Sequence, residues 1–267
     1  MTEAERKKYA KKVIIIAVII MSIVVILFNY INNQANLIEA VKNENETQVK
    51  KMINSGADVN VKNQENEFPL LIAVQNDNKK ITKLLIEAGA DVNQNIDNKT
   101  IIEDLNPLFL AVLNNDLEMV KLLVEKGAEV NIKTQHGETL LPAAMFDADL
   151  EIVKLLIEEG VDVNNVAETG LTPLLFVSSV PERKQTIEII KLLIEAGAKV
   201  NFKDEKLGMT PLMYAAKVGN GKTAKILIEA GANIDQTNNE GKTALDLAKK
   251  ENNKKMIQSL KKAINNK

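Results

Sequence analysis

A ten-residue motif that recurs along this chain restricts what the chain can fold into. The motif reads LLIEAGADVN from Leu84, and related copies start at Leu122, Leu155, Leu192 and Ile226, while a weaker relative, MINSGADVN, ends at Asn60. The glycines of the six copies are 33, 38, 33, 37 and 34 residues apart, at Gly56, Gly89, Gly127, Gly160, Gly197 and Gly231. A period near 33 residues is typical of a stacked array, in which each small unit buries its apolar face against its neighbours.

A second motif repeats with the same period. It reads FPLLIAV, NPLFLAV, TLLPAAM, TPLLFVS, TPLMYAA and TALDLAK, starting at Phe68, Asn106, Thr139, Thr172, Thr210 and Thr243. Threonine is a good residue to cap the start of a helix, and proline fits the first helical position. The VxxLL spacing that follows predicts a second helix with one apolar face, which the recurring glycine ends in a left-handed conformation. The predicted fold class is therefore all-α, built from pairs of short helices.

The two motifs together resemble the ankyrin repeat, whose signatures are TPLHxA and LLxxGADxN. The resemblance covers about residues 34–265 and implies a solenoid of stacked helix-turn-helix pairs with β-turn or hairpin tips. We expect an ankyrin-repeat domain over residues 37–265 with about seven units, including an amino-terminal cap and a polar closing unit from about Asn238. No copy keeps the histidine of TPLH; in four copies its place is taken by Leu71, Phe109, Leu175 and Met213.

The amino-terminal segment predicts a membrane anchor. Residues 13–31 carry no charge, and at 1.5 Å per residue they span about 28 Å, close to the thickness of a bilayer core. We expect a basic cytoplasmic segment over 1–12, one transmembrane helix over 13–31 and a linker over 32–36 before a helix at about Leu37. The basic flank orients the repeats outside the cytoplasm. The Lys/Asn/Ile-rich composition resembles that encoded by AT-rich bacterial genomes, and in a bacterium this compartment is the periplasm. The alternative is secretion after signal cleavage, although Asn32 spoils the small-residue pattern before Ala35.

The sequence argues against an enzyme. His136 is the one histidine and cysteine is absent, so a histidine or cysteine metal site and a Ser-His-Asp triad are not expected. GNGKT at 219–223 and EGKT at 240–243 lack the upstream glycine of a phosphate-binding loop, since Ala216 and Gln236 stand there. We expect no catalytic residue, cofactor, metal or small-molecule substrate, and a nucleotide-binding enzyme is only a distant alternative.

Charge and composition also argue against nucleic acid as a partner. Residues 1–33 hold five of the 34 basic and two of the 36 acidic residues, which leaves 29 basic and 34 acidic residues in the remainder. Aromatic residues make up only 3% of the chain. An acidic body with few aromatic rings is not the pattern of a nucleic-acid-binding protein.

A protein partner is the remaining expectation, and the resemblance implies that it docks on the concave face formed by tips and first helices. The tip after Asn93 is the longest. Pro107 follows Asn93 by fourteen positions, whereas in three other repeats the predicted first helix begins nine positions after the corresponding asparagine. The predicted partner-binding residues lie in this and later tips: Asp97, Asn98, Ile101, Ile102, Glu103, His136, Glu138, Glu168, Lys206 and Met209. A second insertion, near residues 178–186, adds four residues. The alternative is a structural or protective periplasmic factor without a fixed partner.

Overall fold

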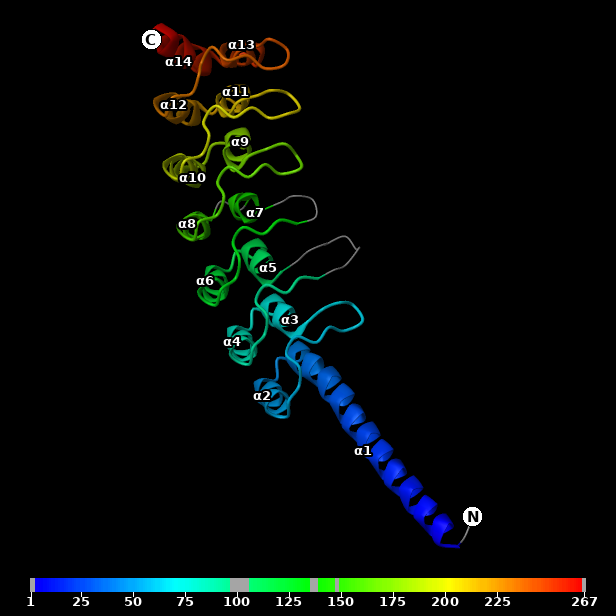
Figure 1. Ribbon diagram of the computed structural model, residues 1–267. Helices are drawn as coiled ribbons and strands as arrows, with labels where there is room; N and C mark the ends of the chain where they lie inside the picture. The colour runs from blue at the N-terminus through cyan, green and yellow to red at the C-terminus, as the bar shows by residue number, and fades with distance from the viewer. Residues whose placement is uncertain (1–2, 97–105, 135–138, 147–148, 266–267) are drawn as a thin grey trace. The chain divides into compact units, whose positions relative to one another are not determined.

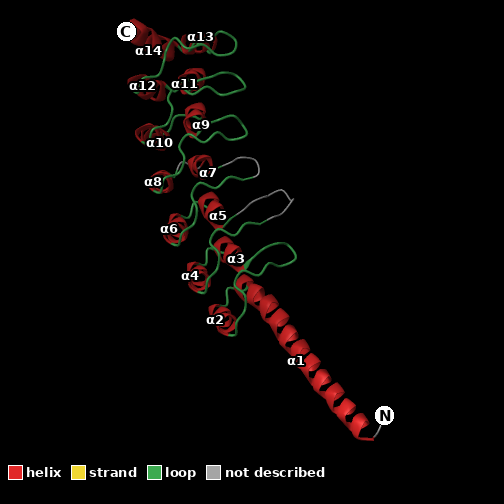
Figure 2. Cartoon of the chain, viewed as in Figure 1, coloured by secondary structure: helices red, strands yellow, loops and turns green. Residues whose placement is uncertain are grey.

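The computed structural model describes residues 3–96, 106–134, 139–146 and 149–265, and within the first helix it describes the side chains of residues 15–28 and of residues from 36 onward. Contacts divide the chain into two compact units, Met1–Asn98 and Lys99–Lys267. All regular structure in the described ranges is helical (Figure 2). The prediction of an all-α fold is confirmed.

The first unit holds two helix pairs. Its helices are α1 (Glu3–Lys42), α2 (Glu46–Asn54), α3 (Pro69–Gln75) and α4 (Lys79–Glu87). The end of α1 packs against α2 and α3, and α2 packs against α4. Leu37, Ile38 and Val41 at the end of α1 are buried, whereas its large apolar side chains between residues 15 and 28 are 50–69% exposed. One helix therefore supplies both the first inner helix of the array and a long exposed apolar segment.

The linker expected over residues 32–36 is helical. Helix α1 runs without a break from Glu3 to Lys42, so the separate helix expected at about Leu37 is the end of α1. No glycine or proline occurs before Gly56, so neither of the two strongest helix-breaking residues stands near the predicted linker. Among the described residues, no helix is both long enough and apolar enough to span a membrane.

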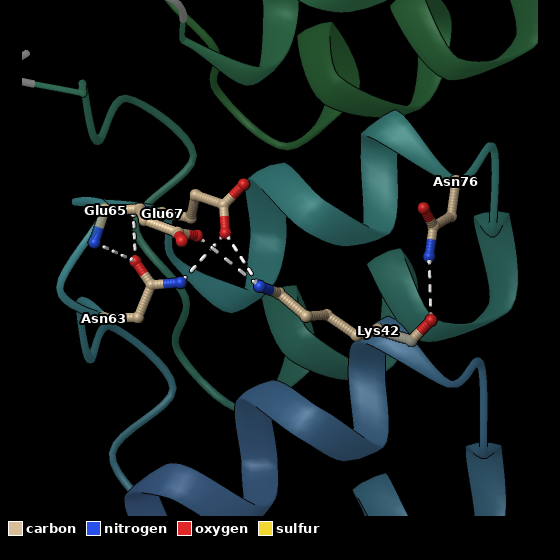
Figure 3. Close-up of polar contacts among 5 residues, drawn as sticks. All are labelled: Lys42, Asn63, Glu65, Glu67 and Asn76. Carbon is tan, nitrogen blue, oxygen red and sulfur yellow. Dashed lines mark hydrogen bonds and ion pairs between the residues drawn. The ribbon is translucent and has the colours of Figure 1, made fainter.

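Polar contacts join the end of α1 to the loop between α2 and α3 (Figure 3). The Lys42 ammonium lies 3.0 Å from Glu67 and 3.8 Å from Glu65. Asn63 donates to Glu67 at 2.8 Å, and Asn76 after α3 donates to the carbonyl of Lys42 at 3.5 Å. The hydrogen bond to Glu67 raises the pKa of Lys42. Burial raises the pKa of Glu67, but the bonds from Asn63 and Lys42 outweigh it and lower that pKa overall. The orientation of α1 within this unit is thus fixed by polar contacts and by the buried side chains.

The second unit holds five helix pairs, and Figure 1 shows them in two layers. The inner layer contains α5 (Pro107–Leu113), α7 (Leu140–Phe146), α9 (Pro173–Ser179), α11 (Pro211–Val218) and α13 (Ala244–Lys250). The outer layer contains α6 (Leu117–Glu125), α8 (Leu150–Glu158), α10 (Lys184–Glu195), α12 (Gly221–Glu229) and α14 (Lys254–Asn265). Each helix packs against the next one in its own layer. With two pairs in the first unit, the described residues form seven pairs.

The capping prediction explains where the inner helices begin. The hydroxyls of Thr172, Thr210 and Thr243 each accept a backbone N–H three residues on, at 3.3 Å. The side-chain oxygen of Asn106 caps α5 in the same way, since it accepts the N–H of Phe109 at 2.7 Å. Phe68 stands at the capping position of α3 in place of threonine. It makes no capping bond, and its side chain is fully buried in the core.

The final asparagine of the motif joins one repeat to the next, which the sequence analysis did not foresee. Asn164 donates from Nδ2 to the carbonyl of Gly197 at 3.0 Å, and its Oδ1 accepts the N–H of Lys199 at 2.8 Å. Gly197 has φ +90°, a left-handed conformation that suits glycine. The same pair of bonds recurs at Asn60, Asn131 and Asn201. At these four positions the asparagine recurs with the period because its side chain pairs with backbone groups of the following unit.

Candidate protein-binding surface

An apolar groove of about 590 Å³ lies on the inner helices of the second unit. Its walls include Phe109 and Leu113 from α5, Pro142 and Phe146 from α7, and Phe176 from α9. Phe146 is 78% exposed and Leu113 is 46% exposed. The groove and the two exposed apolar side chains that line it form a concave apolar surface, which is the kind of place where another molecule can bind.

The helical period explains why these side chains face the groove. Helix α7 buries Leu140, Leu141 and Ala144, so Ala143 and Phe146, three residues apart, lie together on its other face. Covering one phenylalanine side chain is worth about 1.5–3 kcal/mol. A partner that covers Phe146 gains this free energy without disturbing the core.

The position of Phe146 in its repeat has counterparts along the inner layer. Seven residues after each capping position stand Leu113, Phe146, Ser179, Lys217 and Lys250. We call these five residues the inner column. The column is apolar on α5 and α7 and basic on α11 and α13. None of these five residues was among the predicted contacts. Aligning the second motif by its capping residue reveals the column, and a further signal is that Phe109, Phe146 and Phe176 are three of only six phenylalanines.

Within the described part of the chain, the two lysines at the basic end of the inner column, Lys217 and Lys250, make no ion pair of their own. The carboxylate of Glu240 is close enough to feel the charges of both lysines, but it forms its ion pair with Lys242, at 2.6 Å. That bond chiefly, with the charges of Lys250 and Lys217 adding to it, lowers the pKa of Glu240. Excess positive charge therefore lies at this end of the inner face.

The tip before α11 is organised by a buried carboxylate. Asp204 is 3% exposed and accepts the N–H groups of Leu207 at 2.7 Å and Met209 at 2.8 Å, and the hydroxyl of Tyr214 at 3.3 Å. Burial first, and then the charge and hydrogen bond of Asp204, raise the pKa of Tyr214 to about 12. The backbone of this tip is held in one conformation next to the inner layer.

The structure describes three of the ten predicted contact residues. Glu168 is exposed in the turn before α9, between the groove-lining residues Ala167 and Thr169, and Lys206 is exposed on the next tip. Met209 was wrongly predicted as a contact, because its side chain is 2% exposed and its amide is bonded inward to Asp204. The other seven lie outside the described residues: Asp97, Asn98, Ile101, Ile102, Glu103, His136 and Glu138.

The GNGKT segment has a carboxylate of its own chain where a phosphate-binding loop would hold phosphate. Oε2 of Glu182 accepts the N–H groups of Lys222 at 3.0 Å and Thr223 at 3.4 Å at the start of α12. Asn220 donates to the carbonyl of Val180 at 2.7 Å. Both contacts come from the insertion near residues 178–186, which therefore caps the next outer helix. In the described residues, no group of three His, Cys, Asp or Glu side chains could hold a metal ion.

Comparisons with known proteins agree with this architecture. The family described as ankyrin repeats (3 copies) matches residues 37–134, 108–204, 140–238 and 178–267. An ankyrin repeat domain from Acinetobacter baumannii AYE, known from its crystal structure, has a TM-score of 0.68 and 29% identity over 74% of this chain and 98% of that chain.

Two curated relatives are similar over shorter stretches. Palmitoyltransferase ZDHHC17 of Homo sapiens is 44% identical over 64 residues, which is 24% of this chain and 10% of the relative. That of Danio rerio is 33% identical over 93 residues, which is 35% of this chain and 14% of the relative. The chain thus spans a small part of these palmitoyltransferases, and the likeness is confined to ankyrin repeats.

Proposed function

The chain belongs to the ankyrin-repeat family, and from this premise we propose that it holds a protein partner on the inner face of its second unit while α1 tethers it to a membrane. Ankyrin repeats are protein–protein interaction modules and are typically non-catalytic. The observation that carries the proposal is the groove with Phe146, 78% exposed, at its edge. Binding free energy is concentrated in aromatic side chains that enter well-packed pockets. A partner side chain packed against Phe146 and Phe176 supplies such a centre.

The tips are proposed as the rim of this contact. Glu168 belongs to the turn that lines the groove, and Lys206 extends from the tip that Asp204 fixes. Polar rim residues set orientation and association rate more than affinity. The tip with Ile101 and Ile102, and the tip with His136, are proposed as further contacts on the basis of the sequence.

The tether rests on the charge-free stretch of residues 13–31. Its residues 15–28 are helical with exposed apolar side chains. The basic flank favours an extracytoplasmic, periplasmic position for the repeats. Since α1 continues into the first unit, residues 31 and 37 are only about 9 Å apart along the helix. The repeats are then held close to the bilayer by a rigid connection. Secretion after signal cleavage is the competing arrangement.

Flotation with liposomes tests the tether. The full chain is expected to float and to resist extraction at alkaline pH. A variant with Ile20→Arg and Val24→Arg is expected to sediment, because each arginine at the centre of a span costs about 2.5–3.5 kcal/mol. The matched control carries Glu158→Arg and Glu195→Arg on exposed sites of outer helices. Flotation of all three proteins alike would contradict the tether.

Capture from solubilised membranes tests partner binding. Tagged full chain is compared with Phe146→Ser and with the outer-face control Glu158→Ser. One protein retained by the full chain and the control, but reduced about tenfold with Phe146→Ser, supports the proposal. Retention of no specific protein favours a structural or protective factor instead.

A further inference from the structure

The inner column changes from apolar to basic along the second unit. Leu113 and Phe146 line the groove, Ser179 follows, and Lys217 and Lys250 end the column without an ion pair in the described residues. The neighbouring position, four residues after each capping residue, is not basic in any of the five repeats: Leu110, Ala143, Phe176, Tyr214 and Leu247. Of these two positions on the inner helices, only the inner column carries positive charge, and its first two residues line the groove.

The acidic groups nearby leave this charge largely uncompensated. Glu240 is bonded to Lys242 at 2.6 Å, and Asp246 is bonded to Lys249 at 3.2 Å. These carboxylates are matched by their own lysines, which leaves Lys217 and Lys250 as the surplus. A complementary ligand presents an apolar group at one end and negative charge at the other.

We propose that the occupant of the inner column is an extended protein segment with an aromatic or aliphatic side chain in the groove and carboxylates beside Lys217 and Lys250. This identification rests on the proposed function and adds the chemistry of the partner to it. Helices packed in one layer are about 8–10 Å apart, so α7 and α11 are separated by about 20 Å. An extended chain rises about 3.3 Å per residue. The acidic residues therefore lie about six and nine positions from the apolar anchor.

The distribution of charge favours such a segment over a polyanion. The two lysines stand on different helices, the charge of Glu240 acts on both, and Asp246 lies one helical turn before Lys250 on α13. Closely spaced phosphates would meet these carboxylates as well as the lysines, and they would leave the groove uncovered. A segment with spaced carboxylates can meet the lysines and also bury Phe146.

Peptide selection against the full chain in detergent tests the inference. The probe is a random display library of about sixteen residues, long enough to extend from α7 to α13. Enriched peptides are expected to carry an aromatic or aliphatic residue with Asp or Glu about six or nine positions away. Affinity for a fluorescent copy of an enriched peptide is expected to fall about tenfold with Phe146→Ser. It is expected to fall similarly with Lys217→Glu plus Lys250→Glu. It is expected to stay unchanged with Lys255→Glu plus Lys261→Glu on α14.

The other outcomes separate the inference from the proposed function. Enriched peptides that are basic, or that bind all three variants equally, overturn the inference and leave a protein-binding function standing. A change in oligomeric state with Phe146→Ser, in place of lost peptide binding, assigns the groove to a second copy of the chain and also overturns it. Failure to enrich any peptide, while an ankyrin domain with a known ligand enriches that ligand in parallel, contradicts the proposed function as well.

Discussion

Single asparagines join successive repeats in this protein, and their removal has a predictable cost. Asn164→Ala deletes two hydrogen bonds to the following unit, to Gly197 and Lys199. At about 0.5–1.5 kcal/mol per bond, the free energy of unfolding should fall by about 1–3 kcal/mol. Urea unfolding followed by circular dichroism measures this, with Glu158→Ala on the exposed face of α8 as the control. An unchanged midpoint for Asn164→Ala would show that these bonds contribute nothing net.

Tyr214 should titrate apart from an ordinary tyrosine. Its pKa of about 12 in the folded state lies above the usual value of about 10, because burial and Asp204 disfavour the phenolate. Between about pH 10 and 12 the folded state keeps the Tyr214 proton while the unfolded state releases it. The free energy of unfolding therefore falls as the pH rises through this range. Absorbance of the phenolate against pH should show a late phase that is missing in Tyr214→Phe. Loss of a phase near pH 10 instead would refute this.

The residues that sequence analysis located and those that it missed differ in a physical way. Caps such as Thr172 act within one motif copy and can be recognised from spacing alone. The exposure of Phe146 depends on which face of α7 the neighbouring repeats cover, and Met209 is buried although it lies in a tip. Both depend on how neighbouring units pack, which the spacing within one motif copy does not set.

Helix α12 depends on a cap supplied by another element. The Glu182 carboxylate, from the insertion before α10, accepts two N–H groups at the start of α12. Glu182→Ala should lower the free energy of unfolding by about 0.5–2 kcal/mol, the usual cost of losing a helix cap. Glu182→Gln should lose less, since it keeps an acceptor. Arg183→Ala, beside it and exposed, is the control for urea unfolding. Equal midpoints for Glu182→Ala and this control would remove the capping role.

Helix boundaries were predictable where a cap or a glycine marks them and not elsewhere. The start of α9 follows from Thr172 and Pro173, and the end of α10 from Gly197. Helix α1 has neither signal after residue 31, so the expected linker was inferred from the end of the apolar run alone. A change in hydrophobicity changes the surroundings of a helix without ending it, as the continuous α1 demonstrates.

The repeat architecture as a whole was predictable, because a period near 33 residues is a property of the entire chain. Each short helix pair is marginal alone and is stabilised by burying its apolar face against the next pair. The six glycines and six capping positions predict about seven units when both end caps are included. Which surface binds a partner was not predictable in the same way, since repeats share their architecture and differ in their exposed side chains.

Site-specific photocrosslinking in intact cells that make the protein natively tests the central claim most directly. A photoreactive residue replaces Phe146 in the full chain, and a matched one replaces Glu158 on the exposed face of α8. The account predicts one discrete protein adduct from position 146 and none from position 158. Equal labelling at both positions, or no adduct at 146 while the protein remains folded, would contradict binding of a partner on the inner face of the second unit.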